Sequence, residues 1–240
     1  MEKVRRKGNV ETANPLAKEY YDESEIEWSP PNVPISMEQY KELRTYAESK
    51  GVFLQGFKNS DVDISLTKEA IDTAVELFER YPELQGSIRK PFTLYLDRYM
   101  RSVDFAEVKE KVPHILRLNS DSYRNKRALQ TEYGKLADEG WFVRGTSYKS
   151  VIYHEMGHMV SDVYGIDGLS VMKKVLGTDS TAETLLWCKN NLSCYSFKSD
   201  GSEIISEAFS AFYGTDNPIR EIVDFMAICD KMILERRGRR

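Results

Sequence analysis

The chain has 240 residues, 41% of them hydrophobic, which is enough to bury one sizeable core or a core with a smaller lobe beside it. Its 34 basic and 38 acidic side chains give a net charge of -4 at pH 7. That balance offers no general attraction to the phosphate backbone of a nucleic acid or to an anionic membrane. We therefore expect one domain whose partners are neither nucleic acids nor membranes.

The sequence carries no sign of a membrane or secretory segment. No apolar stretch approaches the roughly 18 residues that span a bilayer, and residues 1–12 are charged where a secretory signal is apolar. Cys188, Cys194 and Cys229 are odd in number and lie late in the chain, which suits reduced thiols better than a disulfide framework. We expect a cytoplasmic protein, or one exported by an unconventional or phage-related route.

The composition divides the chain into an arm, a domain and a tail. Residues 1–34 mix charges with four prolines and show no sustained apolar period, so we expect an extended N-terminal arm or linker. Residues 35–234 contain the periodic segments and are expected to form the domain. Residues 235–240 are rich in arginine and are expected to form a solvated basic tail.

The first part of the domain is expected to alternate helices and strands. Ser36 precedes apolar residues at helical spacing, which predicts a capped helix that ends at Gly51. A strand over residues 52–57 is predicted next. A second amphipathic helix follows Thr67 and ends before Pro82.

Short β-prone runs and further helices complete the pattern. Residues 92–96 and 115–118 are bounded by prolines and polar residues and predict strands, and residues 121–137 predict a long helix. Residues 141–144 predict another short strand, and from residue 147 onward the chain is expected to be almost entirely helical. The sequence thus predicts an α+β fold in which a small sheet with helices is followed by a mainly helical C-terminal part.

The segment His154-Glu-Met-Gly-His158 carries the clearest chemical signal. A helix places His154 and His158 on one face, within reach of one metal ion. Glu155 is rotated by about 100° from His154, so it reaches a water on the open side of the metal. Zinc lowers the pKa of such a water to about 7, and the glutamate can take its proton and pass it to a leaving amine. Gly157 permits close approach of another backbone or of the metal. The alternative to a metal site is that the two histidines have this spacing by chance.

A catalytic zinc usually has three protein ligands, so one more is needed. His114, the third histidine of the chain, is better explained as a partly buried strand residue. Residues 202–213 form an apolar helical face with Glu203 and Glu207 beside it. Two acids four residues apart repel each other without a nearby cation, so they are either a solvated acidic edge or part of a metal site. In the second interpretation Glu203 binds zinc, and Glu207 accepts a hydrogen bond from a histidine ring nitrogen.

These residues match a family pattern. The segment His154-Glu-Met-Gly-His158 followed by Glu203-Ile-Ile-Ser-Glu207-Ala-Phe209 resembles the gluzincin zinc metallopeptidases of the anthrax lethal factor type and the similar Pro-Pro endopeptidases. The resemblance covers about residues 148–214 and implies a zincin-like domain that binds one Zn²⁺ per chain, with Glu203 as third ligand. It also implies a tyrosine that donates to the developing oxyanion. Tyr195 is the nearest candidate, and an ordinary half-buried aromatic residue is the alternative.

The family also binds its peptide substrate as an added strand along an exposed sheet edge ahead of the motif helix. An interior strand or a loop is the alternative for the segment expected at that edge. This segment consists of Trp141, Phe142, Val143, Arg144 and Gly145.

The resemblance implies a zinc-dependent endopeptidase that hydrolyses a peptide or protein substrate, with Glu155 as the general base. A second hypothesis is a zinc-binding interaction or structural module of a phage or mobile element that does not turn over substrate. The intact Glu155 argues against it. A third is a zinc-dependent regulator of the small cytosolic peptidase kind that controls repressors, but we find no DNA-binding segment in the sequence.

Overall fold

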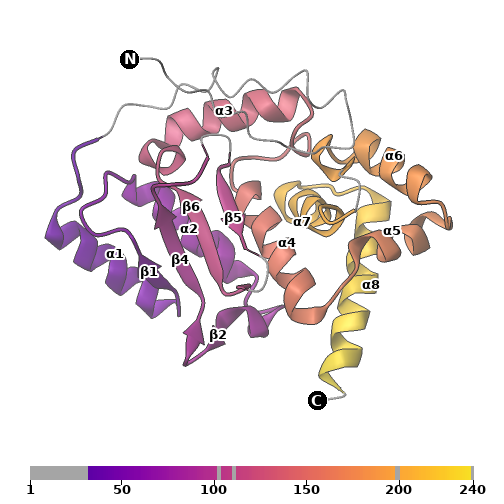
Figure 1. Ribbon diagram of the computed structural model, residues 1–240, viewed down its shortest axis with the longest axis horizontal. Helices are drawn as coiled ribbons and strands as arrows, with labels where there is room; N and C mark the ends of the chain where they lie inside the picture. Colours follow the sequence, from indigo (N-terminus) through magenta and orange to yellow (C-terminus); the bar gives the residue numbers. More distant parts are fainter. Residues whose placement is uncertain (1–31, 102–103, 110–111, 198–200, 239–240) are drawn as a thin grey trace.

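The computed structural model describes residues 32–101, 104–109, 112–197 and 201–238 (Figure 1). Most of the predicted N-terminal arm lies outside these residues. Over the described part of the chain the protein mixes helices with two small sheets, so the predicted α+β class is confirmed. None of its described helices combines the length and apolar character needed to cross a membrane.

A four-stranded sheet forms the centre of the first half of the chain. Its strands, in spatial order, are β1 (Phe53–Gln55), β4 (Thr93–Asp97), β6 (Ile115–Asn119) and β5 (Ala106–Val108). The first three are parallel, and β5 runs antiparallel to β6. Alternate leucines of β4 and β6 are buried on one face of the sheet, as the period of a strand requires: Leu94, Leu96, Leu116 and Leu118. A hairpin of β2 (Gly86–Ser87) and β3 (Lys90–Pro91) forms the second sheet.

Three helices belong to this half. They are α1 (Met37–Ser49), α2 (Ile64–Glu76) and α3 (Lys126–Asp138). The prediction for α1 is confirmed, because Ser36 and Gln39 form a reciprocal capping box at its start. Helix α2 begins before Thr67, since Asp63 caps it by accepting from two backbone amides. Helix α3 begins later than predicted, because a 3₁₀ turn, η4 (Ser122–Arg124), comes first.

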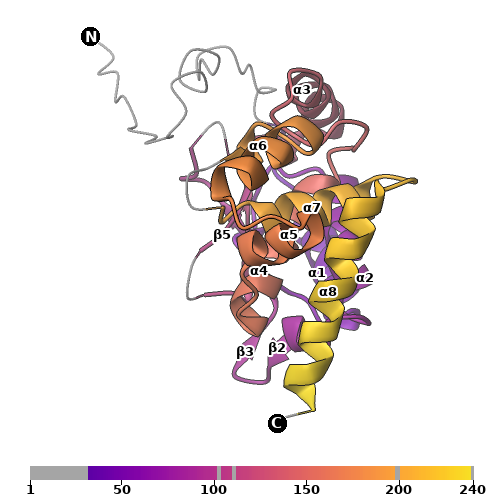
Figure 2. The same cartoon turned by 90° about the vertical axis from the view of Figure 1, so that its right-hand side faces the viewer.

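The second half is helical, as predicted. It contains α4 (Ser150–Tyr164), α5 (Gly168–Leu176), α6 (Thr181–Asn191), α7 (Ile204–Gly214) and α8 (Arg220–Arg237), with a 3₁₀ turn, η5 (Tyr195–Phe197), before α7. Figures 1 and 2 show these helices gathered on one side of the sheet, with α4 between β5 and α7. Helix α4 therefore joins the sheet to the helical half.

The predicted basic tail begins too early. Helix α8 continues through Arg237, whose guanidinium binds Glu83 of the turn η3 (Pro82–Gln85), with 2.6 Å between Nη2 and Oε2. The same Nη2 donates to the hydroxyl of Tyr164 at 2.9 Å. Arg237 holds the pKa of Glu83 down at about 2. These contacts fix the end of α8 to the first half of the chain, so at least residues 235–237 belong to the fold.

The predicted substrate strand over residues 141–145 is wrong, because the chain forms turns there. Helix α3 ends at Asp138, and Gly140, two residues further, has a left-handed φ of 84° that reverses the chain. The amide of Trp141 donates a 2.9 Å hydrogen bond to a backbone carbonyl in the last turn of α3. The ring of Phe142 stacks on that of Tyr133 with 4.7 Å between centroids. The aromatic residues that suggested a strand thus contribute to the end of a helix and to an aromatic stack.

Candidate metal centre

Helices α4 and α7 pack with their backbones nearly in contact. A Cβ atom built on Gly157 of α4 would lie 2.7 Å from the Cα of Ser206 of α7, closer than real Cβ contacts come. Only glycine permits this approach, as the sequence predicted. The close packing brings the residues on either side of Gly157 to those on either side of Ser206.

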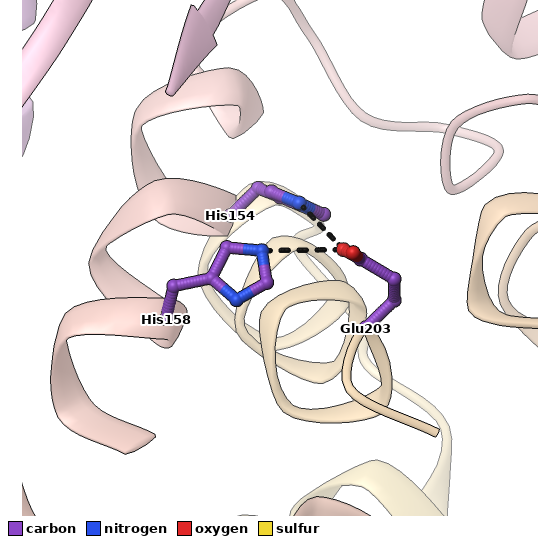
Figure 3. A group of neighbouring side chains, drawn as sticks. All are labelled: His154, His158 and Glu203. Atoms are coloured by element: carbon purple, nitrogen blue, oxygen red, sulfur yellow. Dashed lines mark ion pairs between the residues drawn. The ribbon is translucent and has the colours of Figure 1, made fainter. Parts of the chain in front are cut away.

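A histidine pair and a carboxylate meet at this crossing. Oε2 of Glu203, the residue just before α7, lies 3.2 Å from Nε2 of His154 and 3.2 Å from Nε2 of His158 (Figure 3). One ligand atom from each of the three residues lies within 4.8 Å of the others. Two imidazoles and a carboxylate are a donor set suited to a transition-metal ion. The structure therefore brings the three predicted ligands into a group that can hold one metal ion.

Glu207 lies behind this group, one turn further along α7. Its Oε1 is 3.0 Å from Nδ1 of His154, and only 1% of its side chain is exposed. This close contact with a buried carboxylate restrains the ring, whose Nε2 is directed at Glu203. The predicted neighbourhood of Glu207 and a histidine ring nitrogen is therefore found, but the predicted hydrogen bond is not, because neither Nδ1 of His154 nor Oε1 of Glu207 has a hydrogen-bond partner among the described residues.

The electrostatics of the group suit a bound cation. Burial lowers the pKa of His154, but the carboxylates of Glu203 and Glu207 outweigh this effect and raise it to about 10. Burial raises the pKa of Glu203, but the close contacts with the rings of His154 and His158 bring it well below its usual range. Without metal, a proton on His154 thus supplies the positive charge that the two acids require. A metal ion replaces that proton with a larger charge.

Glu155 is buried beside the ligands and is directed at the sheet. Its Oε2 accepts a 2.7 Å hydrogen bond from the backbone amide of Val108 in β5. Burial raises the pKa of Glu155, while the neighbouring His154 and His158 oppose the increase. Sequence reasoning missed Val108, since a backbone amide in a three-residue strand leaves no side-chain signal.

Tyr195 approaches the group from η5. Its ring centroid is 5.7 Å from that of His154, with the two planes inclined by 57°. The amide of the preceding residue, Cys194, donates to the carbonyl of Gly140 at 2.8 Å, which joins η5 to the loop after α3. The structure therefore brings this predicted site residue next to His154, a candidate metal ligand.

His114 does not join the cluster. It lies just before β6, where its carbonyl accepts a 2.8 Å hydrogen bond from the amide of Thr93. Burial, followed by the charge of Lys90, lowers the pKa of its ring. It is half-buried, as predicted, but it lies in the turn before β6 rather than in the strand.

Comparisons of the chain with protein-family models, curated proteins and solved structures found no match. The assignment of a function therefore depends on the motif and on the geometry of the described residues.

Proposed function

We propose that this chain is a zinc-dependent endopeptidase of the gluzincin type, with a zincin-like fold. The observation that carries the proposal is the convergence of His154, His158 and Glu203 on one point, with Glu155 buried beside them. Three ligands and an adjacent carboxylate outside the ligand set are the requirements of a catalytic zinc site that activates water.

Each residue has a defined task in hydrolysis. His154, His158 and Glu203 hold the ion, and Glu207 keeps the ring of His154 in its binding orientation. Bound zinc supplies a Lewis acid that makes a water more acidic and polarises a substrate carbonyl. Glu155 removes a proton from the attacking water and delivers it to the amine that leaves.

The developing oxyanion needs a donor that faces the reacting carbonyl. The hydroxyl of Tyr195 is suited to this, because its ring lies beside that of His154. A tyrosine in this place stabilises charge that appears only as the peptide bond is attacked, so it contributes to the rate more than to substrate binding.

We assign the substrate-binding edge to β5 rather than to residues 141–145. In the described sheet β5 is the last strand on the side of α4. The amide of Asn119 donates to the carbonyl of Phe105 at 3.0 Å, so by the alternation of antiparallel pairs the amide and carbonyl of Ala106 are directed away from β6. A substrate main chain can pair with these outward groups.

A peptide-library digest tests the proposal. Zinc-loaded protein is incubated with a diverse library, and the products are identified by mass spectrometry with and without a chelator. We expect defined cleavage sites that vanish with the chelator and return with added zinc. Absence of cleavage by zinc-loaded protein contradicts the proposal and supports the non-catalytic zinc-binding module instead.

A further inference from the structure

The general base of the proposed reaction is tied to the sheet by a single backbone hydrogen bond. We infer that the amide of Val108 is a positioning group, which holds Oε2 of Glu155 and leaves Oε1 for the reacting water. The inference rests on the proposed function. The contact joins an amide and a carboxylate oxygen at 2.7 Å, the distance of a strong charge-assisted hydrogen bond.

The strand register explains why this amide is available to Glu155. Ala106 pairs with Leu118 and Val108 with Leu116, while Glu107 pairs with Arg117. Phe105 accepts from the amide of Asn119, so Glu107, two residues further, also exchanges its backbone bonds with β6. The amides of Ala106 and Val108 therefore belong to the outer edge of β5.

Ion pairs connect the strand that carries this amide to the rest of the sheet. Arg117 of β6 forms ion pairs with Glu107 of β5 and with Asp97 of β4, and the Asp97 side chain is only 2% exposed. This clamp ties the three-residue strand to the centre of the sheet. Because the Val108 amide is part of this paired backbone, it can orient the side chain of Glu155 without having to be ordered itself during the reaction.

The contact also limits how a substrate strand can pair. Both backbone groups of Ala106 and the carbonyl of Val108 are directed outward, but the Val108 amide is already bound to Glu155. Main-chain pairing therefore loses one donor at the level of Val108, beside the base. We expect the scissile bond to lie at that level, with the regular pairing on the side of Ala106.

The first test follows the Val108 amide by NMR in metal-free protein, without substrate. Replacing Glu155 by Ala removes the acceptor, so we expect the amide proton to move upfield and to exchange with solvent on the order of tenfold faster. Glu155→Gln keeps a carbonyl acceptor and is expected to shift the signal less. An amide signal that is unchanged in Glu155→Ala overturns the inference.

The second test removes the amide itself. Val108→Pro deletes an N–H on the outer edge, where proline is tolerated, and leaves the pairing with β6. We expect kcat to fall about 10- to 100-fold, with KM within about twofold and zinc content unchanged, because only the orientation of the base is lost. Unchanged kcat in a folded variant overturns the inference.

Two proline controls separate orientation from damage to the strand. Glu107→Pro deletes an amide that pairs with β6 and is expected to lower the melting temperature, whereas Ala106→Pro deletes an outer-edge amide away from Glu155 and is expected to raise KM. A Val108→Pro effect that follows either control, rather than kcat alone, overturns the inference. If the wild-type protein cleaves no peptide, the proposed function fails, and the NMR test alone still decides whether Val108 holds Glu155.

Discussion

The helix pair α4 and α7 and the strand β5 contribute to one site in different ways. The helices meet at Gly157 with no room for a methyl group, and that packing brings together the candidate metal ligands and Glu207. Strand β5 has only three residues and reaches the site through one hydrogen bond. Helix packing thus assembles the candidate ligands, whereas the orientation of Glu155, the proposed base, depends on the sheet edge.

Glu155 is where the two regions meet, and its substitution is expected to have the largest effect. Glu155→Gln removes the base but none of the ligands, so hydrolysis is expected to fall by about 10²- to 10⁴-fold while zinc binding is kept. Cleavage of a fluorogenic peptide and metal content by mass spectrometry check this. A variant with full turnover excludes the mechanism and breaks the link between the two regions.

Substitution of Tyr195 tests whether η5 contributes to the reaction or to zinc binding. In Tyr195→Phe the ring remains beside His154 but the hydroxyl is lost, so kcat is expected to fall by about 10²- to 10³-fold with zinc affinity unchanged. Tyr99→Phe is the matched control, since Tyr99 is 92% exposed, and it is expected to leave kcat unchanged. Steady-state kinetics and a zinc titration of both variants distinguish the two possibilities.

Gly157 tests whether helix packing fixes the metal ligands. Gly157→Ala forces a Cβ against the Cα of Ser206, so the helices must separate. We expect a loss of about 1–3 kcal/mol in the free energy of unfolding, together with weaker zinc binding. Urea unfolding and a zinc titration measure both.

Gly134 in α3 is the matched control for Gly157, because a Cβ there meets nothing within 4 Å. Gly134→Ala is expected to stabilise the protein by about 0.5–1 kcal/mol. Equal effects of the two substitutions contradict the role given to the crossing of α4 and α7.

The pH dependence is expected to be the smallest effect. His154 has its pKa raised from 6.5 to about 10, so in metal-free protein its stabilising contribution is complete below pH 6.5 and is lost as the pH rises through 10. Zinc needs the neutral ring, so its binding near pH 7.5 is expected to release about one proton and to tighten by up to about tenfold per pH unit. Calorimetry in buffers of different ionisation enthalpy counts the protons. Zinc binding without proton release contradicts the charge exchange at His154.

The helical parts of the fold and the cluster of His154, His158 and Glu203 were predictable, because their signals are local and chemical. Apolar spacing and a capping serine identified α1, and the spacing of His154 and His158 predicted the face of α4 on which both rings lie. Glu203 was found because paired acids beside an apolar face need a cation. In each case the side chains themselves carry the information.

The sheet edge was not predictable in the same way. Strand β5 has three residues, too few to show an alternating pattern. Residues 141–145 looked like a strand, but Gly140 and Gly145, with φ of 84° and 78°, turn the chain on both sides. Strand β5 exists because β6 offers it a partner and Arg117 clamps it, and neither contact is local in the sequence.

The clasp of Arg237 has a consequence for how this protein is cut into shorter pieces. The segment with the recognisable motifs ends near residue 214, and a fragment chosen on that basis keeps every ligand. It also removes α8, whose last residue binds Glu83 and Tyr164. Tyr164 is the last residue of α4, the helix that carries both histidines. The segment that carries the motifs is therefore shorter than the segment needed for the fold. A shortened protein should end after residue 237 rather than after the motif.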